Sequence, residues 1–184
     1  MNTHYFLAIE LPASIKDIVR EWREQHPLPF QTWVHRDDYH ITLVFLGNTE
    51  TSVLEKLKQR MDERLPAHRS FDLQLRGLGV FGNPAHPRIL WTGVTEPQPL
   101  FDLQRETADL CRELGFAVET RPYRPHITIA RKWGGPPLAA GVKQWETEVL
   151  QQASFTACRV VLYQTHLARK PKYEVLHTVH LPEE

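Results

Sequence analysis

Apolar side chains recur along the chain with two spacings, and each spacing predicts a type of element. Intervals of three and four residues predict amphipathic helices over 13–25, 50–65 and 98–114. Alternating or continuous apolar runs bounded by Gly and Pro predict strands at 3–11, 39–46, 71–76, 88–94, 116–119, 125–131, 154–166 and 172–181. We expect an irregular loop from Gly77 to Pro84, where glycines cluster, and a short helix or loop between 134 and 150.

This succession of elements predicts an α+β fold with mostly antiparallel strands, because several strands follow one another without an intervening helix. The 184 residues suffice for a sizeable core, so we expect a single domain over 1–184. An apolar content of 41% and a charged content of 24% are typical of globular proteins, and no apolar run is long enough to span a membrane. The first residues carry no basic leader, which indicates a cytoplasmic protein.

A tetrapeptide of the form His-Ile-Thr-hydrophobic occurs twice, at 40–43 and at 126–129, each time within an apolar run. Side chains alternate between the two faces of a strand, so the histidine and the threonine of each copy share one face. With ten histidines in the chain, His-Ile-Thr is expected by chance roughly 0.03 times. A polar face within a core strand is costly unless it is hydrogen-bonded or used. The repeat predicts two imidazoles that meet across a cleft; the alternative is two core strands that each tolerate a hydrogen-bonded histidine.

Two facing imidazoles suit a displacement that needs a base at the attacking oxygen and an acid at the leaving oxygen. Histidine gains or loses a proton near pH 7, so one ring can accept a proton while the other donates one. Hydrolysis of a phosphodiester, such as a strained 2′,3′-cyclic phosphate, has this requirement, and the hydroxyls of Thr42 and Thr128 can donate to phosphoryl oxygens. The sequence contains no His-Glu-x-x-His motif and no Cys/His cluster, so we expect no metal and no other cofactor. Trp33 and Trp91 are candidates for stacking on a base, although packing in the core or at its rim is the favoured interpretation.

The 22 basic and 22 acidic residues leave no net charge, which argues against broad binding to long nucleic acids. A local group of cations, Arg121, Arg124, Arg131 and Lys132, nevertheless brackets His126. These residues form either a solvated loop or a contact for phosphate or RNA. Strand parity counted from His126 places Arg131 on the opposite face, unless the strand ends or bulges between them.

The two motifs and their flanks resemble those of the 2H phosphoesterase superfamily, and within it the RNA 2′,3′-cyclic phosphodiesterase branch, also called 2′-5′ RNA ligase-like proteins. The stretches that carry the resemblance lie at 6–12, 39–47, 88–93, 123–131 and 173–176, in the order of the family. The resemblance implies a bilobal, pseudo-two-fold duplicated unit, with two mostly antiparallel sheets flanking a central cleft and helices outside. It also implies metal-independent opening of a terminal RNA 2′,3′-cyclic phosphate to a 2′-phosphate, with weak reversible 2′-5′ RNA ligation in some relatives.

The resemblance assigns catalysis and phosphate binding to one tetrad, His40, Thr42, His126 and Thr128. Arg131 matches a basic residue that follows the second motif in this branch, and together with Arg124 it is a candidate contact for RNA or phosphate. We expect His40 to be the general acid at O3′ and His126 to be the general base for water. The implied partners are RNA 3′ ends of tRNA-like fragments or short oligonucleotides, bound by a monomer. The alternatives are a related enzyme acting on 2′-5′ oligoadenylate or a cyclic nucleotide, and a non-catalytic binder of RNA ends.

Overall fold

The computed structural model describes residues 3–183, and within this range the chain forms nine strands, four α-helices and three short 3-10 helices. The strands are β1 (Tyr5–Glu10), β2 (Phe30–Trp33), β3 (His40–Gly47), β4 (Phe71–Asn83), β5 (His86–Val94), β6 (His126–Trp133), β7 (Ser154–Ala157), β8 (Arg159–Thr165) and β9 (Tyr173–His180). The α-helices are α1 (Ala13–Gln25), α2 (Thr51–Arg64), α3 (Gln98–Glu113) and α4 (Glu148–Gln152). The 3-10 helices are η1 (Arg36–Asp38), η2 (Leu65–Ala67) and η3 (Val142–Trp145). The predicted α+β class and the three long helices are confirmed.

All the paired strands are antiparallel neighbours in one nine-stranded sheet. Its order is β7-β4-β5-β6-β3-β1-β8-β9, and β2 lies beside the second half of β6. The resemblance had implied two sheets, but the motif strands β3 and β6 pair directly through Ile41 and Ile127 and join the two halves. The chain passes from β7 at one edge of the sheet to β8 near the other edge through a single residue, Cys158. The sheet therefore curves until these two regions approach each other.

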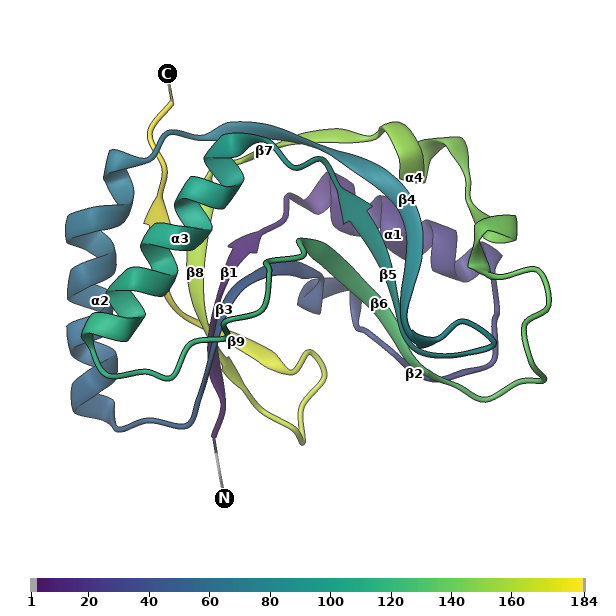
Figure 1. Cartoon of the computed structure of the whole chain (residues 1–184), viewed down its shortest axis with the longest axis horizontal. Helices are drawn as coiled ribbons and strands as arrows, with labels where there is room; N and C mark the ends of the chain where they lie inside the picture. The colour runs from purple at the N-terminus through teal and green to yellow at the C-terminus, as the bar shows by residue number, and fades with distance from the viewer. Residues whose placement is uncertain (1–2, 184) are drawn as a thin grey trace.

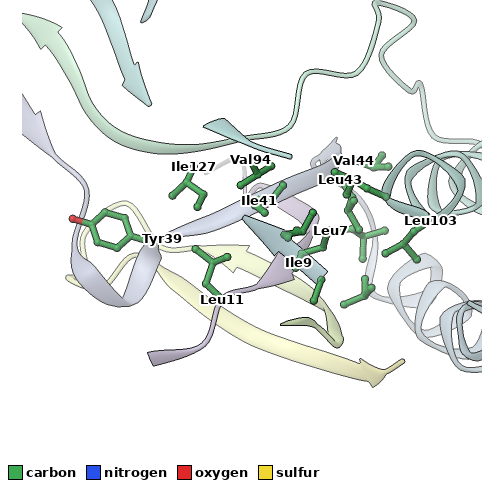
Figure 2. Close-up of a cluster of buried hydrophobic side chains, with 14 of the residues drawn as sticks. Leu7, Ile9, Leu11, Tyr39, Ile41, Leu43, Val44, Val94, Leu103 and Ile127 are labelled. Atoms are coloured by element: carbon green, nitrogen blue, oxygen red, sulfur yellow. The ribbon is translucent and has the colours of Figure 1, made fainter. Parts of the chain in front are cut away.

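The helices cover one face of the sheet, because their apolar stripes share a core with alternate residues of the central strands. Leu7, Ile9 and Ile41 belong to this core and are fully buried, as Figure 2 shows. In Figure 1, α2 and α3 lie side by side at one end of the molecule, and α1 lies at the other. The opposite face of β1 and β8 carries a separate small apolar cluster that includes Phe6 and Tyr163. Since strand residues alternate between faces, this second face is the one that receives the polar residues of the motifs.

The glycine-rich segment after residue 76 is part of a strand, and the expected irregular loop is wrong. β4 continues to Asn83 and forms a hairpin with β5. Gly79 pairs with Trp91, and a Cβ atom at Gly79 would lie only 2.1 Å from a carbon of the Trp91 indole. The neighbouring side chain of Trp91 therefore requires a glycine at this position of the strand. In the sequence, such a glycine cannot be distinguished from a glycine in a loop.

Three further expectations about strands differ from the structure. Residues 116–119 form no strand, and the strand expected over 154–166 is two strands that separate at Cys158. A change of partner causes this separation, since β7 pairs with β4 whereas β8 pairs with β1 and β9. The short strand β2 was not expected, because its pairing with β6 is a tertiary contact. Between residues 3 and 183, no helix is both long enough and apolar enough to cross a membrane.

Candidate active site

The two motifs lie side by side at the middle of the sheet. Their central residues, Ile41 and Ile127, are paired in antiparallel strands and are both fully buried among the core residues. Because the pairing is antiparallel, His40 lies across from the threonine of the second motif, and His126 lies across from the threonine of the first. All four polar side chains point away from the core, and each is half-buried. The structure thus brings together the tetrad that the sequence predicted.

Each motif strand carries a bulge directly after its threonine. In β3 the extra residue is Leu43, which has no partner in β1, and in β6 it is Ile129, which has no partner in β5. A bulge reverses the parity of the residues that follow it. Phe45 and Arg131 therefore return to the face that carries the histidines. The sequence placed Arg131 on the face of His126 only if the strand ended or bulged between them, and the bulge is present. The guanidinium of Arg131 is close enough to lower the pKa values of His40 and His126.

The ring of His40 is held in one orientation and one tautomer. Its Nδ1 donates to the carbonyl of Asp38 at 2.7 Å, since a carbonyl can only accept. Its Nε2 is then the acceptor for the hydroxyl of Thr42 at 2.9 Å. Burial lowers the pKa of His40 to about 4, helped by the positive charges of His126 and Arg131 and opposed by the hydrogen bond to Asp38. His40 is consequently neutral at pH 7, with a lone pair on Nε2.

His126 is held in the same way but in a more open environment. Its Nδ1 donates to the carbonyl of Arg124 at 2.7 Å, and this bond is exposed to solvent. Burial also lowers the pKa of His126, and the hydrogen bond to Arg124 opposes the shift. Phe81 contacts the ring edge to face, at 4.9 Å between centroids. The backbone carbonyl of Arg124 therefore orients the ring of His126.

A set of aromatic residues encloses the ring of His40. Phe6 lies 4.8 Å and Tyr173 lies 5.3 Å from it, measured between ring centroids. Phe6 is only 4% exposed, so it packs on the histidine and offers no open surface to a substrate. This apolar wall is the physical cause of the desolvation of His40.

Asp38 connects these aromatic residues with the motif strand β3, and no role for Asp38 was predicted from the sequence. Its carboxylate is 3% exposed and accepts hydrogen bonds from the backbone N–H groups of Lys172 and Tyr173, at 2.8 and 3.2 Å. The same residue offers its carbonyl to His40. Asp38 thus positions both the ring of His40 and the tyrosine that covers it. The contact joins residues more than 130 positions apart, and an aspartate in a polar turn gives no sequence signal of such a contact.

A cavity of about 540 Å³ opens beside His126 over β4 and β5. Its lining includes Phe81 and Trp91 together with three cations, Arg76, Arg124 and Lys143. The candidate cation Arg124 therefore lines the cavity and also holds His126 through its carbonyl. Within residues 3–183 no three His, Cys, Asp or Glu side chains gather in a way that could hold a metal ion.

Comparisons with known proteins agree with this geometry. A family model described as the 2'-5' RNA ligase superfamily matches residues 11–169. The chain is 40% identical over 179 residues to an RNA 2',3'-cyclic phosphodiesterase of Geobacillus stearothermophilus, and 35% identical over 175 residues to one of Bacillus subtilis. Each alignment covers 95% of this chain, but 56% of the Geobacillus protein and 94% of the Bacillus protein, so the chain spans just over half the length of the former.

Solved structures show the same similarity. E. coli LigT complexed with 3'-AMP has a TM-score of 0.77 and 26% identity, covering 98% of this chain and 99% of that chain. A protein of Thermus thermophilus, TT0787, has a TM-score of 0.77 and 25% identity over the same shares of the two chains. Since the family model spans most of the sequence, including both motif strands, the chain belongs to the 2'-5' RNA ligase superfamily.

Proposed function

We propose that this protein is an RNA 2′,3′-cyclic phosphodiesterase that opens the terminal cyclic phosphate of RNA to a 2′-phosphate. The observation that carries the proposal is the pairing of the motif strands, which sets each histidine across from the threonine of the other strand on one open face. The relatives named above support the choice of substrate. The proposed substrates are the 3′ ends of tRNA-like fragments or short oligonucleotides, and the proposed setting is a monomer in the cytoplasm.

In this mechanism the two imidazoles act on opposite sides of phosphorus. His40 takes a proton from water on Nε2 as the water oxygen bonds to phosphorus. The bond from phosphorus to O3′ breaks, and His126 gives its Nε2 proton to O3′. The products are a 2′-phosphate and a free 3′-hydroxyl, and proton exchange with solvent resets both rings.

The environments of the two rings favour this assignment over the one expected from the sequence. His40 is enclosed by aromatic rings and has a pKa of about 4, so it is available as a base over a wide pH range. His126 is hydrogen-bonded in a more solvent-accessible position. A phosphate anion bound beside His126 raises the pKa of its ring, which makes it the better proton donor.

The remaining groups stabilise charge on the phosphoryl oxygens. Thr42 donates to His40 in the free protein and can redirect its hydroxyl to a phosphoryl oxygen when substrate binds. Thr128 offers a second hydroxyl from the same face, and Arg131 supplies a positive charge. Because proton transfer and these donors account for every step, the proposal includes neither a metal ion nor another cofactor.

Product analysis on a short RNA with a 2′,3′-cyclic terminus, in the presence of EDTA, tests the proposal. We expect release of a 2′-phosphate by the wild-type protein, and a loss of about 10²-fold or more in His40→Ala and in His126→Ala. His180→Ala, which removes an exposed histidine at the end of β9, is the matched control and keeps full activity. Circular dichroism establishes that all three variants fold.

Four results would contradict parts of the proposal. Near-wild-type turnover in either motif variant rejects the two-histidine mechanism. A 3′-phosphate product rejects protonation of O3′ by His126. Binding of cyclic ends without turnover indicates a non-catalytic binder, and faster cleavage of 2′-5′ oligoadenylate under the same conditions indicates the related enzyme.

A further inference from the structure

The cavity beside His126 has a flat aromatic floor that is built into the sheet. A Cβ atom at Gly79 would lie 2.1 to 2.6 Å from three carbons of the Trp91 indole, and one at Gly93 would lie 3.3 Å from the same ring. The six-membered ring of the indole therefore rests against the backbone of β4 and β5 at positions where only glycine leaves room. Trp91 also lines the cavity. An indole that is supported by backbone and lines a cavity offers a surface on which a nucleobase can stack.

The walls of this cavity carry an excess of positive charge. Arg76, Arg124 and Lys143 line it against a single acidic residue, Glu96, although the chain as a whole has no net charge. Lys143 forms an ion pair with Glu146 at 2.7 Å. Among the residues that the structure describes, Arg76 and Arg124 have no acidic partner, so these two guanidinium groups are available for an anion.

The proposed reaction, on which this inference rests, already has its own groups for the cyclic phosphate. His40, His126 and the two threonines surround it, and Arg131 adds a charge. Since O3′ leaves toward His126, the terminal ribose and base lie on that side, over Trp91. The next anion along an RNA chain is the phosphodiester at the 5′ oxygen of that ribose. A free cyclic mononucleotide lacks this second phosphate.

We propose that the groove of Trp91, Arg76, Arg124 and Lys143 binds the terminal base and the phosphodiester on its 5′ side. The terminal base stacks on Trp91, and the guanidinium of Arg76 contacts the 5′ phosphate with help from the other two cations. The protein therefore selects the ends of RNA chains over free nucleoside 2′,3′-cyclic phosphates, and it does so with a second phosphate that takes no part in the chemistry.

Steady-state kinetics on three substrates test this. The substrates are adenosine 2′,3′-cyclic phosphate, the same nucleotide with a 5′-phosphate, and the dinucleotide ApA with a 2′,3′-cyclic end. We expect kcat/KM to rise about tenfold or more from the first substrate to the second, and to remain at least as high for the third. Arg76→Ala is expected to lower the ratio of kcat/KM between the second and the first substrate by roughly tenfold. Arg105→Ala, which removes an exposed arginine of α3 outside the cavity, leaves the ratio unchanged.

Each other outcome overturns the inference. Equal kcat/KM on the first two substrates shows that the 5′ phosphate is not recognised, even if the dinucleotide is preferred. If Arg76→Ala lowers kcat/KM equally on all three substrates, this residue does not recognise the second phosphate. Opening of the cyclic end of ApA to a 2′-phosphate supports the proposed function in either case, so the two proposals fail separately. No hydrolysis of any cyclic substrate rejects the function itself.

Discussion

Acidification is expected to destabilise the folded protein through one residue, His40. Its pKa is about 4 in the folded protein, against 6.5 for a histidine in an unfolded chain. The unfolded state therefore binds a proton as the pH falls below 6.5, whereas the folded state resists protonation until about pH 4. Stability contributed by the neutral ring is present in full above pH 6.5 and is lost as the pH falls from 6.5 to about 4.

The size of this effect follows from the shift. One pKa unit corresponds to about 1.4 kcal/mol, so the difference between 6.5 and about 4 amounts to about 3 kcal/mol in the free energy of unfolding. This is a large share of the stability of an ordinary domain, which is about 5–15 kcal/mol. Several carboxylates titrate over the same pH range, so the contribution of His40 has to be measured as a difference between two proteins.

The assay is urea denaturation of the wild-type protein and of His40→Asn, at pH values from 7 to 4. Asparagine cannot be protonated in this range, and its side-chain amide can still donate to the carbonyl of Asp38. The variant is expected to be the less stable protein at pH 7 and to gain about 3 kcal/mol relative to wild type by pH 4. Parallel stability curves for the two proteins would refute the argument, because they would mean that the ring of His40 is solvated. A His180→Asn variant, which replaces an exposed histidine, serves as the control.

Substitutions at three other positions have expected outcomes that can be measured directly. Asp38→Ala leaves two partly buried backbone N–H groups without their acceptor and lowers the free energy of unfolding, measured in urea, by about 3 kcal/mol. Asp38→Asn, which keeps one acceptor, loses less, and equal losses would contradict this account. Gly79→Ala forces the ring of Trp91 off the sheet and raises KM for the cyclic dinucleotide several-fold, and an unchanged KM would show that the ring is no binding surface. Arg131→Met removes a cation that lowers the pKa values of both histidines, so both values rise in an NMR titration of the imidazole signals; unaltered titration would place the guanidinium away from the site.

Much of the fold is readable from the sequence because its elements are amphipathic and local. The three long helices are found where apolar residues recur at three and four positions, since a helix buries one stripe whatever lies beneath it. The tetrad is readable as well, because strand parity fixes which face receives His40 and Thr42. Alternation shifts by one residue at Cys158, from Phe155 and Ala157 to Val160, but this shift does not say that the chain changes sheet partners there. Periodicity therefore identifies strands but carries no information about which strands they meet.

The role of Asp38, which was missed, and that of Trp91, which was left open between stacking and packing, depend on contacts between distant residues. Asp38 matters because its carboxylate meets the start of β9, and Trp91 matters because Gly79 of another strand leaves room for its ring. Each observation requires two segments to be placed side by side. The glycines of β4 were visible in the sequence, but a glycine beside a large ring and a glycine in a loop look alike there.

Equal motifs in the two halves do not lead to equal roles, because the residues around them differ. Both motif strands carry the same bulge, and the residue that each bulge returns to the face of the histidines is Phe45 in β3 and Arg131 in β6. Phe45 is 55% exposed and brings no charge, while Arg131 supplies a cation near both rings. Aromatic rings then enclose His40, whereas a cavity with three cations opens beside His126. An enclosed, neutral imidazole is suited to removing a proton from a small molecule such as water. The open side, with its aromatic floor and positive charge, has the space for the ribose and base whose O3′ departs from phosphorus while O2′ stays bonded to it. The asymmetry of the surroundings therefore supports the proposed assignment of His40 as the base and His126 as the acid.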